Sequence, residues 1–559
     1  MKTCSSLVRS ALLIALAGIL MPTAAAVAQK ADKQQQPVVS AARVSELMKQ
    51  ALEQVQGGQA AAPGQPAAQA PRPTFDLKVE DAVTRAIENN ISLASQRLNP
   101  QIQDLSLASI RAAYRPTVTA NFTDSGSTST GTSTLSGGSS VTSGTYDYNG
   151  SVSQTVPWTG ASTSLSWSNR RNESNNNNAT FNPSYTSSFQ ASVTQPLWRN
   201  FRIDGTRNSL WQQLITRQLA DVTLRASTLT TVANTRNAYW DYVYAIQALD
   251  VAKQSKSLAD KLVQDNQARV EIGTLAPLDV ITAQAQAASS QVRVVQAEQT
   301  RQQAEISLKR LIVSSTQDPL WNSTVNPVDR PETMSAPPGI DLEAAIRTAL
   351  EKRTDLVTSR ENLRKSDLAL KYSRNQTLPQ ADVTASYGAN GTGGDQFERS
   401  SLVGGQMVLV SEGGWADAVT VMRKVRQPSW SVRLSFSYPI GTSAADASYA
   451  SARVTYQQSQ ATLKAQELSV ATDVTTAALN VQNTWQQVQS ARVARELAQR
   501  QLEAEQSKFE VGMQTSYYVV NAQNNLLSAQ TSELSAILAY RKALVNFQLV
   551  QETPASGGA

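Results

Sequence analysis

Side chains that usually catalyse reactions or hold metal ions are scarce in this sequence. Its 559 residues include no histidine, which is the commonest general base and the commonest metal ligand. Cys4 is the only cysteine, so the chain lacks the thiols that disulfides and cysteine-bound zinc require. A serine triad of the usual kind needs a histidine, and no local acidic motif suggests paired catalytic carboxylates. We therefore expect no catalytic residue, no metal site and no cofactor.

One glycine-centred segment occurs twice, and its spacing is the clearest signal in the chain. Residues 270–284 read VEIGTLAPLDVITAQ, and residues 509–523 read FEVGMQTSYYVVNAQ. The two segments align without a gap, with Gly273 opposite Gly512. Glycine adopts a positive φ without a Cβ penalty, so each glycine is expected to end a helix and let the chain reverse.

The repeat extends along most of the chain. Pro116 and Pro196 in the first half correspond to Pro379 and Pro439 in the second half. Pro116 and Pro196 are farther apart in the sequence than Pro379 and Pro439. The first half therefore carries an insert between its two prolines. Each half is expected to run from short helices through a β-segment to a long helix, a glycine turn and another helix.

The N-terminus has the pattern of a secretory signal peptide. Lys2 and Arg9 precede an apolar run, and the small-residue sequence AVA ends at Ala28. Lys2 and Arg9 contribute to a formal net charge of only +6, and no cluster of lysine and arginine points to nucleic acid. The predicted organisation is a signal peptide (1–28), an Ala/Gln/Pro-rich tether (29–73), a first helix–strand–helix repeat (74–330), a second repeat (331–551) and a flexible tail (552–559).

The β-segments alternate between apolar and small polar residues, as in Val432, Leu434, Phe436 and Tyr438 with serine or arginine between them. A water-filled barrel in lipid needs this pattern, and a half-buried sheet of a soluble sandwich has it equally. The polar stretches at 125–145 and 170–184 read as long loops, as on the outer face of bacterial barrels. No stretch after the signal peptide is apolar for long enough to span a bilayer as a helix.

The helices are predicted to be unusually long. Proline and glycine are absent from Thr206 to Glu271 and again from Ser451 to Glu510, so each helix could run roughly 60–65 residues, about 95 Å. Two rows alternate three- and four-residue steps, which is the period of a coiled coil: Leu229, Val232, Arg236, Tyr239, Val243 and Ile246, and Val474, Ala478, Val481, Trp485 and Val488. Such helices must pack against the repeat partner or another subunit.

The signal peptide, the doubled plan and the two glycine turns together resemble the TolC-type outer membrane efflux protein family, from about Asp76 to Gln551. The resemblance implies an α+β membrane protein in which three chains form a transmembrane β-barrel, with four strands per chain. A long α-helical coiled-coil barrel would continue it into the periplasm of a Gram-negative-type cell. The chain would then be an outer-membrane exit duct that takes cargo from a periplasmic adaptor and an inner-membrane pump.

The resemblance also implies roles for the two turns. The expected adaptor contacts are Ile272, Gly273 and Thr274 in the first turn, and Val511, Gly512 and Met513 in the second. The expected residues of the periplasmic aperture are Asp279, Gln514, Tyr518 and Asn521. Tyr518 and Asn521 stand where a well-known member has ring aspartates, and Gln514 stands where it has the arginine that pairs with the aspartate matching Asp279. An acidic, salt-locked entrance is therefore not implied, and Asp279 also suits the first turn of a helix electrostatically.

Two other classes of protein compete with the duct. One is a secreted trimeric coiled-coil fibre or adhesin, which usually carries a single membrane anchor near one end. Here β-segments recur in the middle of both halves, which favours the duct. The other is an envelope hydrolase, which the absence of histidine and of a second cysteine disfavours.

Overall fold

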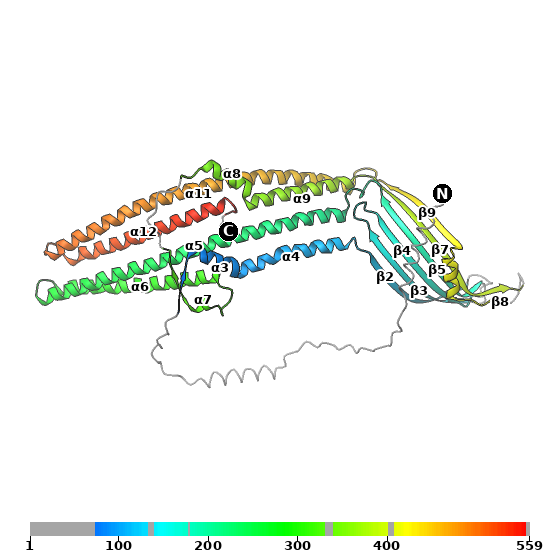
Figure 1. Ribbon diagram of the computed structural model, residues 1–559, viewed down its shortest axis with the longest axis horizontal. Helices are drawn as coiled ribbons and strands as arrows, with labels where there is room; N and C mark the ends of the chain where they lie inside the picture. Colours follow the sequence, from blue (N-terminus) through cyan, green and yellow to red (C-terminus); the bar gives the residue numbers. More distant parts are fainter. Residues whose placement is uncertain (1–72, 132–138, 177–178, 330–338, 401–406, 555–559) are drawn as a thin grey trace, which may run out of the picture. The chain divides into compact units, whose positions relative to one another are not determined.

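The computed structural model describes residues 73–131, 139–176, 179–329, 339–400 and 407–554, which contain long helices and one large sheet (Figure 1). The predicted signal peptide, the tether apart from Pro73 and the last five residues of the tail lie outside these residues. None of the described helices combines the length and the apolar character that crossing a bilayer requires.

Both halves of the described chain run from short helices through strands to a pair of long helices. The first half contains β1 (Thr74–Leu77), α3 (Val79–Asn89), α4 (Ile91–Ala112), β2 (Thr117–Thr130), β3 (Ser140–Thr155), β4 (Ser162–Ser174), β5 (Phe181–Pro196), α5 (Gly205–Glu271), α6 (Pro277–Ile312), α7 (Pro319–Asn322) and β6 (Thr324–Pro327). The second half contains α8 (Leu342–Lys352), α9 (Thr354–Gln376), β7 (Gln380–Arg399), β8 (Met407–Ser411), α10 (Trp415–Arg423), β9 (Gln427–Ser437), α11 (Ala444–Glu510) and α12 (Ser516–Val550).

The two longest helices, α5 and α11, have 67 residues each. Helix α5 begins after Asp204, whose carboxylate accepts a hydrogen bond from the backbone N–H of Arg207 at 2.8 Å. Helix α11 begins with a capping box, in which Ser443 and Asp446 each accept a hydrogen bond from the backbone N–H of the other. At 1.5 Å per residue each helix is about 100 Å long, as the sequence predicted.

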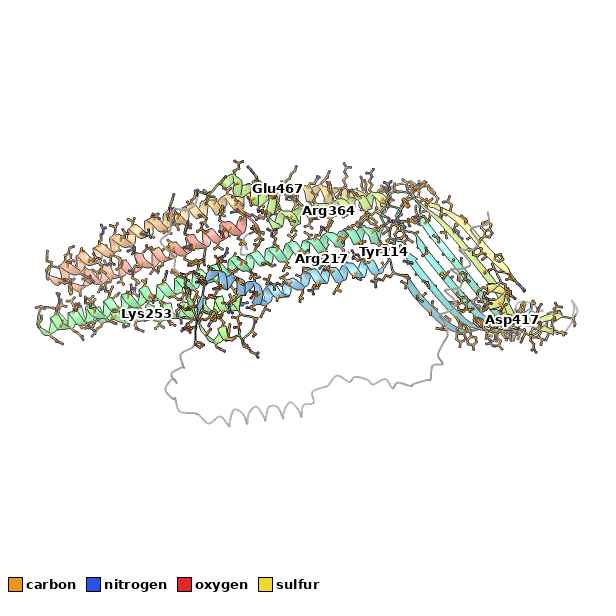
Figure 2. The ribbon with its side chains drawn as sticks, in the orientation of Figure 1. Tyr114, Arg217, Lys253, Arg364, Asp417 and Glu467 are labelled. Carbon is orange, nitrogen blue, oxygen red and sulfur yellow. The ribbon has the colours of Figure 1, made fainter. Side chains whose placement is uncertain are left out.

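Of the coiled-coil row predicted on α11, Val474, Ala478, Val481 and Val488 are buried and Trp485 is partly buried. Of the row predicted on α5, Tyr239 and Val243 are buried and the other four residues are partly buried. Helix α5 packs along α6, α11 packs along α12, and α12 also contacts α5. Between these helix pairs and the sheet, α4 packs on α5, α5 on α9 and α9 on α11, so these four form a row (Figure 1). Arg217 on α5, labelled in Figure 2, joins α5 to α4 through an ion pair of 2.6 Å with Asp104.

One antiparallel sheet contains seven strands of the described chain, in the order β2-β3-β4-β5-β7, with β8 and β9 both paired to the outer edge of β7. Strand β9 pairs with the part of β7 next to the helices, and β8 pairs with its far end. The resemblance implied four strands per chain, and the sheet has more. The first half supplies β2 to β5, so two of the additional strands lie where the insert was expected, and the short strand β8 of the second half is the third.

In both polar stretches that were predicted as loops, the residues that the structure describes are largely strand. Residues 125–145 contain the end of β2 and the start of β3, and residues 170–184 contain the end of β4 and the start of β5. Serine and threonine hydroxyls pair across these strands, as in the 3.0 Å hydrogen bond between Ser127 and Ser143. The loop prediction was wrong because such cross-strand hydroxyl pairs suit a strand as well as a turn.

The predicted alternation is confirmed and gives the sheet two different faces. Strand register places the larger apolar side chains on one face: Val118, Phe122, Tyr148, Val152, Leu165, Trp167, Phe189, Val193, Tyr387, Trp430, Val432, Leu434 and Phe436. The other face carries mainly hydroxyls, which pair across neighbouring strands. Examples are Ser164 with Ser192 and Ser386 with Ser431, both at 2.7 Å.

Helix α10, which includes Asp417 in Figure 2, packs on β7 and β5 near the far end of the sheet. Gly391 makes this approach possible, because a Cβ there would lie only 1.9 Å from the carbonyl oxygen of Ala418. The indole N–H of Trp415 donates to Oδ1 of Asn169 at 3.1 Å. These contacts place α10 on the apolar face, because Asn169 points to the same side as Trp167.

Candidate functional site at the two glycine turns

The first glycine turn joins α5 to α6. Gly273 has a φ of +79°, and its N–H donates to the carbonyl oxygen of Val270 at 3.0 Å. The N–H of Thr274 donates to the carbonyl oxygen of Arg269 at 2.9 Å. These two bonds form a Schellman motif, which satisfies the last carbonyls of a helix and reverses the chain.

The second glycine turn joins α11 to α12 in the same way. Gly512 also has a φ of +79°, and its N–H donates to the carbonyl oxygen of Phe509 at 3.1 Å. The N–H of Met513 donates to the carbonyl oxygen of Lys508 at 2.9 Å. The positive φ predicted at both glycines is confirmed, and the two turns share one backbone conformation.

Each turn exposes its side chains. We call residues 272–274 the first tip and residues 511–513 the second tip. Ile272, Val511 and Met513 are 74%, 71% and 76% exposed, and Thr274 is also exposed. A Cβ added at either glycine would meet no other atom within 4 Å. Exposed apolar side chains gathered at a helix end are typical of a surface that contacts another protein.

The two helical hairpins touch each other beside the tips, through contacts that the sequence did not reveal. The hydroxyl of Ser516 donates to Oδ1 of Asp279 at 3.0 Å, which joins the start of α12 to the start of α6. The Arg269 guanidinium donates to the carbonyl oxygen of Phe509 at 3.0 Å and lies over the Phe509 ring at 4.4 Å. Asp279 therefore takes part in a contact between the two hairpins, but its partner is a serine.

The other three predicted aperture residues do not join that contact. Tyr518 is half exposed and packs edge-on against Tyr517, with 5.7 Å between ring centres. Asn521 lies one turn further along α12 and is exposed. Gln514 is partly buried, and its Oε1 has no hydrogen-bond partner among the described residues. Tyr518 and Asn521 thus share an exposed stripe of α12, whereas Gln514 faces the packed side.

Other buried polar atoms in the tip-side parts of the long helices also lack a partner within the described chain. They are Asn266 Oδ1, Ser290 Oγ, Arg293 Nε, Glu505 Oε2 and Gln523 Oε1. Each such atom costs about 1–3 kcal/mol relative to a satisfied one. The packing of the tip-side helices is therefore less favourable than an apolar contact of equal area. Water that reached these atoms would remove the cost.

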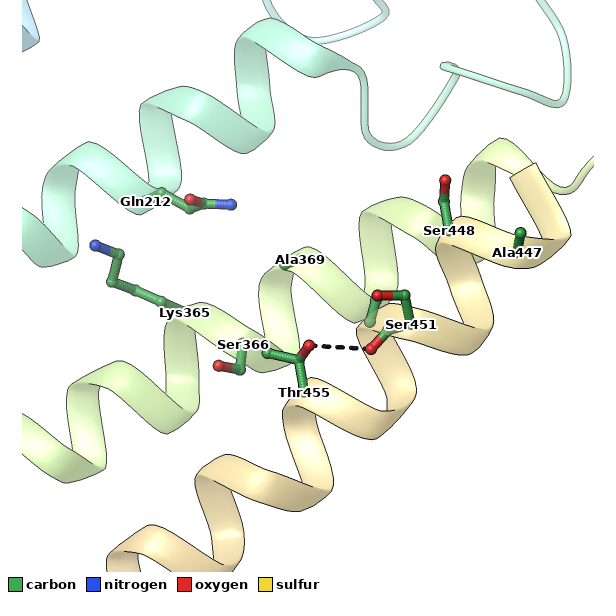
Figure 3. A pocket seen from close by; sticks show the side chains of 9 residues that line it. Gln212, Lys365, Ser366, Ala369, Ala447, Ser448, Ser451 and Thr455 are labelled. Carbon is green, nitrogen blue, oxygen red and sulfur yellow. Dashed lines mark hydrogen bonds between the residues drawn. The ribbon is translucent and has the colours of Figure 1, made fainter. Parts of the chain in front are cut away.

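A groove of about 570 Å³ lies between α5, α9 and α11 (Figure 3). It is lined by Gln212, Lys365, Ser366, Ala369, Ala447, Ser448, Ser451, Ala452 and Thr455. Lys365 is the only ionisable residue in this lining, and its Nζ donates to the hydroxyl of Thr216 at 3.2 Å. The groove therefore contains no acid–base pair and no activated nucleophile.

The sequence matches the outer membrane efflux protein family over residues 147–313 and 345–550, which is more than half of the chain. The chain belongs to this family. The two matched segments contain the two long-helix pairs and both tips, so the repeated plan is a property of the family fold. Members of the family are outer-membrane efflux proteins.

Solved structures share the fold at low sequence identity. The Campylobacter jejuni CmeC outer membrane channel superposes with a TM-score of 0.59 at 14% identity, covering 85% of both chains. The open state of the Neisseria gonorrhoeae MtrE outer membrane channel gives 0.55 at 18% identity, covering 85% of this chain and 89% of that one. The Vibrio cholerae outer membrane protein VceC gives 0.57 at 11% identity, covering 86% and 97%. A comparison with curated protein sequences finds no match.

Proposed function

We propose that three copies of the chain form an outer-membrane exit duct of a tripartite efflux or secretion system. In this proposal the three sheets close a transmembrane barrel, and the helices continue it as a periplasmic tunnel. Cargo enters from a periplasmic adaptor and an inner-membrane pump. The observation that carries the proposal is that one chain combines a two-faced sheet with open edges and two matching tips on long helix pairs.

Open edges support assembly with further copies. Within the described residues β2 pairs only with β3, and β9 pairs only with β7, so each strand has one row of free backbone donors and acceptors. In lipid each unpaired backbone group costs several kcal/mol, so the edges must be closed by another chain. The helix row ends at the same two edges, because α4 leads into β2 and β9 leads into α11. Apolar side chains on these end helices are more than half exposed, including Leu98, Ile102 and Leu105 on α4 and Leu468 and Leu479 on α11.

Aromatic residues support insertion of the sheet into a bilayer. Trp198 and Phe436 meet edge-on next to the helices, with ring centres 6.1 Å apart. Trp430 lies towards the far end and is 73% exposed. From Trp430 to Tyr438 the chain advances about 26 Å at 3.3 Å per residue, which at a tilt of 35–45° is a rise of about 19–22 Å, most of the apolar band of bacterial barrels, about 25 Å tall.

The tips support docking on an adaptor. In a three-copy assembly each chain would present the first tip and the second tip, and their common backbone conformation gives a partner two similar contact points. Ile272 and Thr274 of the first tip and Val511 and Met513 of the second tip supply the exposed side chains. We infer that Gly273 and Gly512 are required because they hold these side chains in position.

The aperture would be formed by the starts of α6 and α12. Asp279 bonded to Ser516 would hold the two hairpins of one chain together. Tyr518 and Asn521, on the exposed stripe of α12, would face the pore and narrow it by contact. Gln514 would lie in the turn beside them. This closed state depends on packing and on hydrogen bonds more than on ion pairs.

A secreted fibre or adhesin explains the sheet less well. A fibre in water has no use for an apolar face on which Val432, Leu434 and Phe436 are each more than 60% exposed. A lipid-facing barrel buries that face, and the opposite hydroxyl-rich face then lines a water-filled lumen.

The experiment that tests the proposal is extraction of the protein from outer membranes, followed by native mass spectrometry in detergent. We expect three copies per particle, and a monomer that precipitates when detergent is removed. Deletion of the gene should make the cell retain the cargo that the duct exports. A monodisperse monomer in buffer without detergent would refute the duct.

A further inference from the structure

We propose that the barrel has eighteen strands, six from each of three copies, and that its exit is correspondingly wide. This inference depends on the proposed function, because it takes the three-copy duct as its starting point. It adds to that function an interface, β9 against β2 of the next copy, and a pore size. The resemblance by itself implies only four strands per chain and therefore a narrower barrel.

The first argument is that β2 and β3 continue the pattern of the rest of the sheet. Val118 on β2 pairs with Val152 on β3, which pairs with Leu165 on β4, so all three lie on the apolar face. Phe122 and Tyr148 pair on the same face, with ring centres 5.8 Å apart. A hairpin that projected into water would not keep one face apolar and aromatic. These strands therefore belong to the same two-faced wall as β4, β5, β7 and β9.

The second argument is the direction of the edge strands. Every neighbouring pair from β2 to β9 is antiparallel, and the path β2-β3-β4-β5-β7-β9 contains six strands. Strands β2 and β9 consequently run in opposite directions. The β9 edge of one copy can then pair antiparallel with the β2 edge of the next, and the same contact repeated around a symmetry axis closes a ring.

The third argument compares two perimeters. The row α4-α5-α9-α11 gives twelve helices in three copies, and at 8–10 Å between axes their ring measures about 95–120 Å. Eighteen strands 4.8 Å apart, tilted by 35–45°, form a ring of about 105–120 Å. Twelve strands would give only about 70–80 Å at the same tilt. At this tilt six strands per chain match the helical tunnel without a taper, whereas twelve strands would match it only at a steeper tilt, above about 50°.

The lumen of this barrel is wide and lined mainly by hydroxyls, with Asp147, Arg170, Asp382 and Arg433 as charged residues of the same face. A perimeter of about 105–120 Å corresponds to a backbone diameter of about 34–38 Å, so the barrel can pass objects as thick as an α-helical hairpin. The lumen face is lined by hydroxyl pairs that join neighbouring strands, such as Thr119 with Ser151 and Thr194 with Thr384. The ion pair of Arg170 and Asp147 on the same face, at 2.7 Å, is neutral overall. Selection of cargo must then occur at the tips and in the pump.

The test is disulfide crosslinking between copies in a Cys4→Ser background. Ser431→Cys on β9 is combined in turn with cysteine at Thr117, Thr119, Asn121 or Thr123 on β2, all on the lumen face. The matched series combines Ser431→Cys with cysteine at Ser162, Ser164, Ser166 or Ser168 on β4. Within one chain β9 lies several strands away from both β2 and β4, so an efficient crosslink reports the contact between copies.

We expect oxidation to give covalent trimers at one or two neighbouring positions of the β2 series and none in the β4 series. Crosslinking in the β4 series would show that β2 and β3 lie outside a twelve-strand barrel, and it would overturn the inference. A trimer that crosslinks in neither series, or that shows twelve strands by cryo-electron microscopy, would do the same. Native mass spectrometry of the same samples reports the trimer separately, so loss of the trimer identifies a failure of the proposed function itself.

Discussion

Replacing either tip glycine with valine separates backbone strain from every other effect. Gly273 and Gly512 both have a φ of +79°, and a Cβ at either position would meet nothing within 4 Å. The substitution therefore causes no clash, and its cost is that of holding a side-chain-bearing residue in the left-handed region. That cost is about 1–2 kcal/mol per residue. This cost weakens the two hydrogen bonds of each Schellman motif. The long helices pack along the rest of their length, so the fold is retained.

Hydrogen exchange at the two tips measures this strain directly. A loss of about 1–2 kcal/mol in local opening free energy raises exchange about 5- to 30-fold, since 1.4 kcal/mol is tenfold. We expect that increase at the tip amides, including those of Thr274 and Met513, with the trimer retained and export lost. The matched variants are Gly273→Asn and Gly512→Asn, because asparagine tolerates the left-handed region. A second control is Gly150→Val, where open space surrounds an extended strand residue.

Three results would contradict this reasoning. Unchanged exchange in the valine variants would mean that the positive φ carries no strain. Equal increases in the asparagine variants would mean that loss of glycine itself, rather than conformation, is responsible. Normal export with both tips disturbed would show that the tips are not the adaptor contact, although the turn geometry would stand.

Four further outcomes are expected. Tyr518→Ala should raise single-channel conductance in a planar bilayer, and unchanged conductance would exclude a packing gate. Ser516→Ala should lengthen the open time in the same recordings, because it removes the hydrogen bond to Asp279, and Asp279→Asn should act less because an amide oxygen still accepts that bond. Gly391→Ala should displace α10 and increase its cleavage by protease, because the new Cβ would lie 1.9 Å from a main-chain oxygen of that helix. Burial raises the pKa of Tyr242 from 10.0 to about 12, so its contribution to stability is complete below pH 10 and is lost towards pH 12. Alkaline titration of the unfolding free energy should therefore show a shallower loss in Tyr242→Phe.

The turns could be predicted from sequence because their cause is local. A glycine that follows a long run without proline or glycine, and that occurs twice in matching contexts, identifies a helix end and a reversal. The two-faced sheet was predictable for the same reason, since alternation at a period of two residues is written along each strand. Both features depend on neighbours within a few residues.

The number of strands could not be predicted, because composition does not separate a polar strand from a loop. Residues 125–145 are mostly serine, threonine and glycine, and their strand character depends on hydroxyl partners across the sheet. The alternation of apolar and polar residues also weakens there, since both faces of these strands carry small polar side chains. The extent of the sheet follows from pairing between segments, and pairing is not local.

The tip contacts and the buried charges were missed for a related reason. Arg269 meets Phe509, and Asp279 meets Ser516, across more than two hundred residues of chain. Arg353 is 1% exposed and bonds Asp473 at 2.6 Å, an interaction that anchors the start of α9 to α11. The repeat indicates that the two hairpins are equivalent, but it does not state which side chains face each other when they pack.

The two repeats have diverged in one part of the chain and not in the other. Helices α5 and α11 both have 67 residues, and α6 and α12 have 36 and 35. The short helices α3 and α8 have 11 each. In contrast, four strands of the first half correspond to two long strands and a short one in the second.

Equal helix lengths are required if both tips are to reach the same partner at the same level, since one extra turn would move a tip by about 5.4 Å. The sheet has a weaker requirement: its strands must be even in number, so that opposite edges can pair. A hairpin added to one repeat satisfies this condition and widens the barrel without moving either tip. The asymmetry of the chain therefore lies where the proposed assembly tolerates it.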